Sequence, residues 1–143
     1  MHVTIAVVEW CSRRADLLAI RHAVFVHEQG VPIELEHDAH DQLALHLLVT
    51  DADGRPIATA RMLPDGHIGR MAVLPAWRKQ GIGSAMLREL VRLANAQRID
   101  KLFLNAQCEA EAFYQLLGFS AEGPIFVDAG IDHRRMSMTV ASS

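Results

Sequence analysis

A strand pattern and a helix pattern meet in this chain at Arg78-Lys79-Gln80-Gly81-Ile82-Gly83-Ser84. The residues before this stretch, 67–74, have strand composition, and the residues after it, 83–97, repeat apolar side chains at helical spacing. The first backbone N–H groups of a helix lack partners, and the helix dipole makes that end positive. Glycines at 81 and 83 let the backbone approach a ligand closely, and Arg78 and Lys79 add positive charge. The stretch therefore predicts a cradle for phosphate or pyrophosphate.

Two common phosphate-binding motifs do not fit this turn. A P-loop requires a lysine after its last glycine, and here Ser84 follows Gly83. A dinucleotide-binding fingerprint requires a third glycine, and Met86 occupies that position. The remaining alternative is a helix start that uses glycines without binding any ligand.

The rest of the chain predicts one α/β (α+β) domain over residues 1–143. A first strand, 3–8, precedes a helix that begins after Ser12 as N-cap and ends near Gly30-Val31-Pro32. Residues 34–42 are predicted as a loop or short helix. Three strands joined by tight turns then form an antiparallel meander, at 45–50, 56–63 and 67–74.

The second half continues with a helix at 83–97, a strand at 102–105 and a helix at 109–117. A strand beginning at Phe119 and a last strand at 135–140 complete the order β-α-βββ-α-β-α-β-β. The strand–helix–strand unit from Ile68 to Asn105 requires a parallel pair, so we expect a mixed central sheet.

Composition excludes several classes of protein. The 143 residues carry a net charge of -3, which argues against a general nucleic-acid binder, and no apolar stretch is long enough for a membrane span. The first residues lack the basic region of a signal peptide, and the two cysteines form no C-x-x-C motif. We therefore expect a cytoplasmic protein without nucleic-acid or membrane partners.

Two motifs resemble the GNAT N-acyltransferase superfamily. Residues 78–83 match its acetyl-coenzyme A pattern Arg/Gln-x-x-Gly-x-Gly/Ala, and Ala112-Phe113-Tyr114-x-x-x-Gly118-Phe119 resembles a second family segment. The N-terminal half looks like a small bacterial subset, through Arg21-x-x-Val24-Phe25-Val26-x-Glu28-Gln29 followed by Glu36-x-Asp38-x-x-Asp41. The resemblance covers nearly the whole chain.

The resemblance implies transfer of an acetyl group from acetyl-coenzyme A, as co-substrate, to an amine by direct attack in a ternary complex. It places the pantetheine arm against the strand Met71-Ala72-Val73, where one N–H group could face the oxyanion. It places the pyrophosphate on Arg78, Lys79, Gln80, Gly81, Ile82, Gly83 and Ser84, and lets the amide of Asn105 reach the pantetheine. Tyr114 occupies the family position of the general acid, although it could instead be a core aromatic.

The group that receives the amine's proton is not assigned by the sequence. Glu28 is the candidate for amine recognition or general base, with a solvated carboxylate at a helix end as the alternative. Residues 28–41 carry five acids and no Lys or Arg, which suggests a site for a cationic amine. His37-Asp38-Ala39-His40-Asp41 lacks metal-ligand spacing, so we expect no metal. His133-Arg134-Arg135 is compatible with either a basic surface group or a cofactor contact.

Two alternatives to the acetyltransferase remain open at this point. One is a coenzyme A-binding module without transfer activity, and the other is an unrelated phosphate-binding α/β domain. The acceptor is expected to be a small molecule or peptide amine, and a homodimer is possible.

Overall fold

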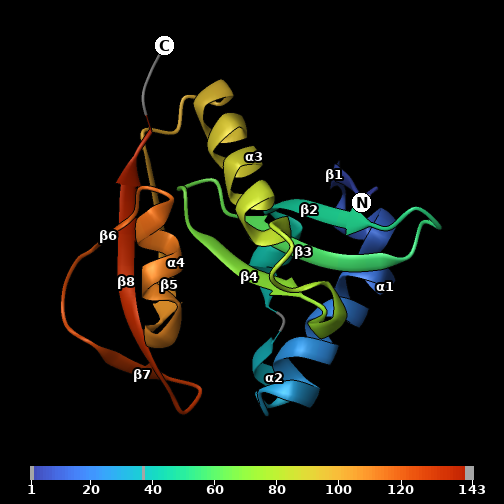
Figure 1. Ribbon diagram of the computed structural model, residues 1–143, viewed down its shortest axis with the longest axis horizontal. Helices are drawn as coiled ribbons and strands as arrows, with labels where there is room; N and C mark the ends of the chain where they lie inside the picture. The colour runs from blue at the N-terminus through green and yellow to red at the C-terminus, as the bar shows by residue number, and fades with distance from the viewer. Residues whose placement is uncertain (1, 37, 141–143) are drawn as a thin grey trace.

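Two four-stranded sheets form the frame of the molecule (Figure 1). The computed structural model describes residues 2–36 and 38–140. The first sheet is antiparallel and consists, in order, of β1 (Thr4–Val8), β2 (Leu45–Thr50), β3 (Pro56–Met62) and β4 (Ile68–Val73). In the second sheet β8 (Ile131–Thr139) pairs on one side with β5 (Lys101–Gln107) and also pairs with β6 (Ser120–Ala121) and β7 (Phe126–Asp128).

The two sheets meet at one parallel bridge, between His67 and Phe103. The N–H of Phe103 donates to the carbonyl oxygen of Gly66 at 3.1 Å, and the rings of His67 and Phe103 stack with centroids 4.8 Å apart. Gly66 is required here, because a Cβ would lie 2.2 Å from the carbonyl oxygen of Lys101. The expected parallel contact between β4 and β5 is thus confined to their beginnings. We call the region in which these two strands then part the fork.

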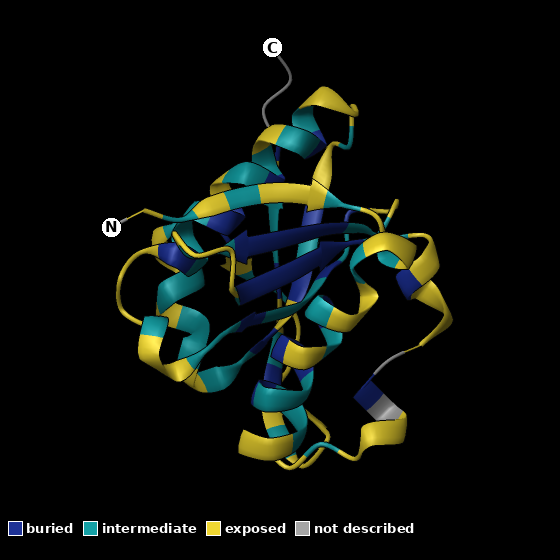
Figure 2. Cartoon of the chain, turned by 90° about the vertical axis from the view of Figure 1, so that its right-hand side faces the viewer, coloured by how far each residue is buried: buried dark blue, intermediate teal, exposed yellow. Residues whose placement is uncertain are grey.

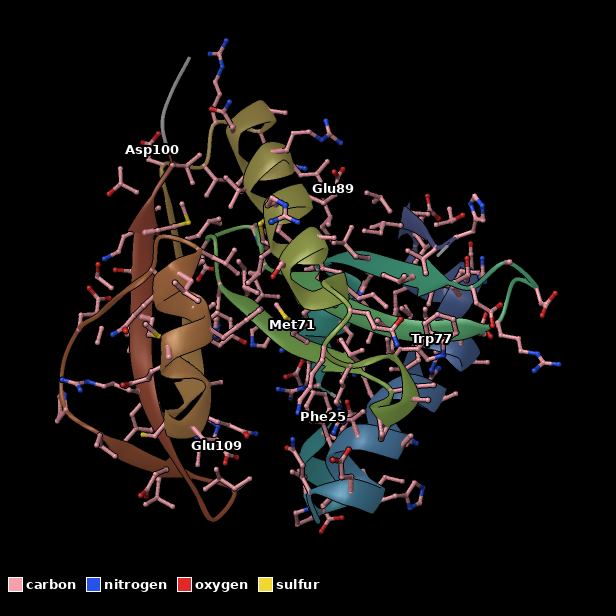
Figure 3. The ribbon with its side chains drawn as sticks, in the orientation of Figure 1. Phe25, Met71, Trp77, Glu89, Asp100 and Glu109 are labelled. Atoms are coloured by element: carbon pink, nitrogen blue, oxygen red, sulfur yellow. The ribbon has the colours of Figure 1, made fainter. Side chains whose placement is uncertain are left out.

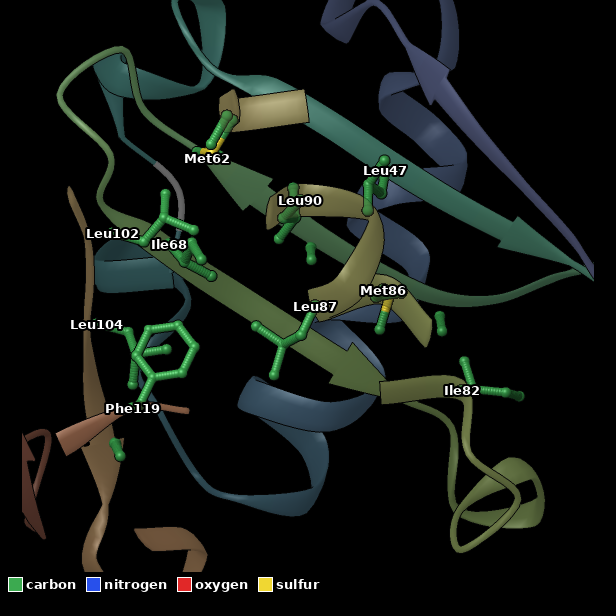
Figure 4. Close-up of a cluster of buried hydrophobic side chains, with 14 of the residues drawn as sticks. Leu47, Met62, Ile68, Ile82, Met86, Leu87, Leu90, Leu102, Leu104 and Phe119 are labelled. Atoms are coloured by element: carbon green, nitrogen blue, oxygen red, sulfur yellow. The ribbon is translucent and has the colours of Figure 1, made fainter. Parts of the chain in front are cut away.

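Helices cover both faces of the first sheet. Leu17 and Ile20 of α1 (Trp10–Arg21) pack with Leu48 and Ala72 on one face, and α3 (Ile82–Ala96) covers the other. The apolar side of α3 packs between the sheets in the main core, whose members include Leu47, Met62, Ile68, Ile82, Met86, Leu87, Leu90, Leu102, Leu104 and Phe119 (Figure 4). Because the first sheet is covered twice, β2 and β3 are buried along most of their length, and Figure 2 shows the buried positions gathered in the central strands.

The N-terminal helix differs from the prediction at its start and in its winding. It begins at Trp10 with Glu9 as N-cap, not after Ser12, because the N–H of Ser12 already bonds the carbonyl oxygen of Glu9. From His22 to Glu28 it continues as a π-helix, η1, which the sequence pattern did not predict. It ends as expected, with Gly30 at φ +75°. Among the described residues, no helix is both long and apolar enough to cross a membrane.

The remaining elements are short. They are α2 (Ile33–Glu36), η2 (Ala39–Gln42), η3 (Pro75–Trp77), η4 (Cys108–Ala110) and α4 (Glu111–Leu116). In the C-terminal half the strand predicted to end at Asn105 runs on to Gln107, and the last strand begins at Ile131. The prediction missed β7, a fully exposed three-residue strand with no alternation of burial to reveal it.

A buried ionic network holds α2 and η2 against the first sheet. Arg21 donates from Nη1 and Nη2 to the two carboxylate oxygens of Asp41, at 2.9 and 3.1 Å, and from Nε to Glu36. Nη1 of Arg61 in β3 donates to Asp41 at 2.8 Å and to Asp38 at 2.9 Å. Arg21, Glu36 and Asp41 are each only 1% exposed, so these contacts form away from water. The network fastens three segments that are distant in sequence.

The same network pairs with arginines three of the five acidic residues that the sequence suggested for an amine site. Arg70 adds a third arginine, donating to the carbonyl oxygen of Glu36 at 2.6 Å and to Asp38 at 3.3 Å. Burial raises the pKa of Asp38, but hydrogen bonds and charge from Arg61, together with the charge of Arg70, lower it to about 2. The interpretation of residues 28–41 as an acidic surface for a cation is therefore wrong for Glu36, Asp38 and Asp41. Residues 37–41 contain the histidines and acids considered above as metal ligands, and His37 of that segment lies outside the described residues.

Replacement of Asp41 by alanine tests the network. It leaves Arg21 and Arg61 buried without their shared acceptor, so we expect a loss of about 3–5 kcal/mol in the free energy of unfolding. Urea denaturation measures this loss, with Asp100→Ala as the control, since Asp100 is exposed and on the surface beyond α3 (Figure 3). Equal stability of the two variants would contradict the structural role of the network.

Candidate functional site

The turn before α3 has the geometry of an anion cradle. Gly81 is the N-cap of α3 with φ +84°, and the N–H of Ala85 makes the first intrahelical bond, to the carbonyl oxygen of Gly81. The N–H groups of Ile82, Gly83 and Ser84 precede that bond and have no intrahelical acceptor. Lys79 also has a positive φ, of 63°, so the turn is curved tightly around these amides. The cradle can bind a phosphate with backbone N–H groups at the positive end of a long helix.

The free edge of β4 lies next to this cradle. The register of β3 and β4 shifts so that Arg70 and Met71 oppose a single residue of β3, and Arg70 takes φ +48° in this bulge. Beyond the bulge the N–H of Leu74 bonds the carbonyl oxygen of Ile57 in β3. Because the direction of hydrogen bonding alternates along an antiparallel strand, the N–H and carbonyl of Val73 point away from β3, into the fork.

This alternation separates the three residues predicted to contact the pantetheine. Ala72, one residue before Val73, directs its backbone groups toward β3, and its side chain is buried. The side chain of Met71 packs against the main core. The N–H of Val73 is therefore better placed to meet a ligand than the N–H of Ala72.

An ion pair joins the cradle to the N-terminal helix. Arg78 donates from Nη1 and Nη2 to the two carboxylate oxygens of Glu28, at 2.7 and 2.6 Å, and from Nε to the carbonyl oxygen of Val73 at 2.9 Å. These hydrogen bonds lower the pKa of Glu28, the residue considered as a general base. The structure thus brings together two predicted site residues from opposite ends of the fork, and in this state each neutralises the other.

A second contact crosses the fork between η1 and β5. Nε2 of Gln107, at the end of β5, donates to Oε1 of Gln29 at 3.1 Å. Asn105 lies two residues earlier on the same face of β5, is exposed, and pairs in register with Arg135. Sequence reasoning missed Gln29 and Gln107 as a pair because 78 residues separate them. The available signal was the position of Gln29 directly after Glu28.

Tyr114 lies on α4 beside the start of α3. A Cβ built on Gly83 would be 3.4 Å from Cζ of Phe113, which shows how closely α4 approaches the cradle. The ring of Tyr114 contacts Phe113 and Phe119 edge to face, with centroids 5.1 and 6.0 Å apart. Burial raises its pKa to about 12, so the phenol keeps its proton at neutral pH. Both predicted roles, core aromatic and proton donor, are compatible with this position.

A groove of about 720 Å³ lies at a different place, between the start of α1, the start of β2 and the end of β3. Its lining includes Trp10, Cys11, Leu43, Met62 and Pro64, and none of the predicted site residues contributes to it. The chemistry-bearing residues therefore gather at the fork, where Figure 3 shows Phe25 of η1 near the carboxyl end of β4.

Known proteins resemble this chain in sequence and in fold. Residues 11–140 match the family model described as "Acetyltransferase (GNAT) domain". The chain is 37% identical over 124 residues to the acetyltransferase candidate BSU40680 of Bacillus subtilis (strain 168), covering 82% of this chain and 84% of that one. It is 34% identical over 125 residues to the N-acetyltransferase YjcF of the same organism, covering 85% and 89%.

A solved structure gives the same result. The crystal structure of an acyl-CoA N-acyltransferase from Pseudomonas aeruginosa superposes with a TM-score of 0.86 at 27% identity, covering 96% of this chain and 99% of that one.

Substitution of Gly81 by valine tests the cradle. A β-branched residue at φ +84° is strained by about 1–2 kcal/mol, so the turn should shift and the affinity for coenzyme A should fall at least tenfold, measured by calorimetry.

Gly54→Val is the matched control, since Gly54 has φ +80°, and a Cβ at either glycine meets nothing within 4 Å. The control should lose comparable stability and keep its affinity for coenzyme A. If both variants bind coenzyme A equally well, the cradle is not the binding site.

Proposed function

The chain belongs to the GNAT acetyltransferase family, and on that premise we propose that it transfers the acetyl group of acetyl-coenzyme A to the amine of a small molecule or peptide. The observation that carries the proposal is the meeting of the α3 cradle, the free edge of β4 and Tyr114 at one fork. These are the parts that positioning, electrostatic stabilisation and proton donation require.

The α3 cradle is suited to the pyrophosphate of coenzyme A. Residues 78–84 supply backbone N–H groups at a helix N-terminus, together with the side chains of Arg78 and Lys79. The pantetheine arm would then extend along the free edge of β4 toward the fork. Asn105, on the opposite side of the fork, can offer its amide to the same arm.

The acetyl carbonyl needs a hydrogen-bond donor where negative charge develops. The N–H of Val73 points into the fork, so we assign it to the oxyanion in preference to the N–H of Ala72. When the carbon–sulfur bond breaks, the thiolate takes a proton from the phenol of Tyr114. A phenol with a pKa of about 12 is a weak acid, so this transfer depends on close alignment with the sulfur.

Glu28 fits recognition of the acceptor better than proton removal. Its bond with Arg78 lowers its pKa, which makes it a weaker base but a stable anion. If Arg78 turns to the pyrophosphate when coenzyme A binds, the carboxylate of Glu28 becomes free to attract the ammonium group of the acceptor.

A coenzyme A release assay over a panel of amines tests the proposed function. We expect thiol release from acetyl-coenzyme A with at least one amine, and formation of the acetylated amine by mass spectrometry. Tight binding of coenzyme A without release for any amine would overturn it in favour of a coenzyme A-binding module.

Tyr114→Phe tests the proton donor. The ring and its contacts remain, so the affinity for coenzyme A should stay the same while kcat falls about 10²–10⁴-fold, as for loss of a general acid. Steady-state kinetics and calorimetry measure the two quantities. An equal fall in both would assign Tyr114 to packing alone.

Glu28→Gln tests whether the carboxylate of Glu28 and the pyrophosphate of coenzyme A compete for Arg78. Breaking an exposed ion pair worth about 0.2–1 kcal/mol should tighten coenzyme A binding up to about fivefold at low salt. Glu89→Gln is the matched control, because Glu89 forms an exposed pair with Arg92 on α3. A weaker affinity in Glu28→Gln would mean that Arg78 keeps its bond to Glu28 in the complex.

A further inference from the structure

His133, on the strand that pairs with β5, is a residue that the proposed function has not used. It lies near the start of β8, directly opposite Gln107 in the register of β5 and β8, so the two side chains share one face of the sheet. Gln107 in turn contacts Gln29 of the N-terminal half. The histidine is therefore the neighbour, across the β5–β8 ladder, of the residue that links β5 to the end of η1. It is only 9% exposed.

The hydrogen bonds of the ring determine which nitrogen can accept a proton. Nδ1 of His133 lies 2.7 Å from the carbonyl oxygen of Ile131. A carbonyl can only accept, so Nδ1 carries the hydrogen and Nε2 of the neutral ring presents a lone pair. The ring of Phe126 stacks on the imidazole with centroids 5.9 Å apart, which fixes the plane of the ring.

Nothing else in the described part of the chain uses Nε2. No described residue forms a hydrogen bond with Nε2. The atom is also not fully enclosed by the protein. A buried histidine with one nitrogen anchored and the other open is prepared to take up a proton without turning. That is the property a general base needs.

We propose that Nε2 of His133 accepts the proton that the acceptor's ammonium group must lose, at a site completed by the side-chain amides of Gln29 and Gln107. The proposal rests on the acetyl transfer proposed above and assigns the base. The amide of Gln107 donates one hydrogen bond to the amide of Gln29. The N–H groups of Gln29 and a lone pair on Oε1 of Gln107 are therefore left to bind polar groups of the amine substrate.

The proton balance is complete with these residues. The N–H bond of the ammonium breaks, its electron pair stays on nitrogen, and the proton goes to Nε2 and then to solvent. The nitrogen lone pair forms the bond to the acetyl carbon, and the carbon–sulfur bond breaks with its electrons on sulfur. The thiolate takes the proton of Tyr114, and the second proton leaving the nitrogen restores the phenol. The net products are the acetylated amine, coenzyme A and one proton.

The charged groups around this end of the fork do not replace the histidine. Glu28 is assigned above to attracting the ammonium group of the acceptor, and Arg135, two residues along the same face of β8, is held over the ring of Phe103 and by Glu122. Asp132, the neighbour of His133 in β8, is exposed and alternates to the other face.

His133→Gln tests the proposal in the full-length protein. With the most reactive amine of the panel, kcat/KM for the amine near pH 7 should fall about 100-fold, the lower end for loss of a general base, with an unchanged dissociation constant for coenzyme A. As the pH rises through the pKa of the amine, the acceptor arrives already neutral, so the defect should shrink to about threefold or less. His40→Gln, at an exposed histidine of η2, is the control and should match the wild type.

The outcomes separate this proposal from the previous one. A wild-type protein that releases no coenzyme A with any amine overturns acetyl transfer itself. Normal transfer by the wild type together with an undiminished rate in His133→Gln overturns only the role of His133. A defect that stays constant with pH, or that is matched by a loss of coenzyme A affinity, assigns the histidine to structure and also overturns the proposed base.

Discussion

The carboxylate of Asp41, shared by Arg21 and Arg61 below the surface, is the contact on which the rest of the site depends. Arg21 closes α1, so its anchoring sets where η1 begins and therefore where Glu28 and Gln29 lie. Such a network is costly to desolvate and gains its value from complete pairing. Its role here is positional, since it fixes one helix against two strands, and the ion pair of Glu28 with Arg78 extends this connection to the cradle.

The elements defined by local patterns were predictable. The apolar period of α3, the turns of the meander and the glycines before α3 indicated the fold class and the cradle, and the family comparison confirms the fold and the acetyltransferase class. The features that the sequence did not predict depend on contacts between residues that are distant in the chain. The π-winding of η1, the use of Asp38 and Asp41 by arginines, and the Gln29–Gln107 contact have no periodic signal. The five acids of residues 28–41 suggested an acidic surface for a cationic amine, because the sequence does not show where the basic partners of these acids lie.

The proposed function requires a chain of mild net charge to bind both coenzyme A and an amine. Several opposite charges near the fork are paired with each other, as Arg78 is with Glu28 and Arg61 is with Asp38 and Asp41. Uncharged groups then become important for the acceptor. In the proposed site, the amides of Gln29 and Gln107 and the imidazole of His133 are the uncharged groups for the amine, beside the carboxylate of Glu28.

The bulge at Arg70 has a mechanical consequence. One backbone irregularity both changes the register of β4 before its free edge and turns the Arg70 side chain toward Glu36 and Asp38. Strand β4, which is proposed to support coenzyme A, and the residues Glu36 and Asp38 therefore both depend on the bulge at Arg70. A substitution at Arg70 would therefore affect both the edge of β4 and the position of Glu36 and Asp38.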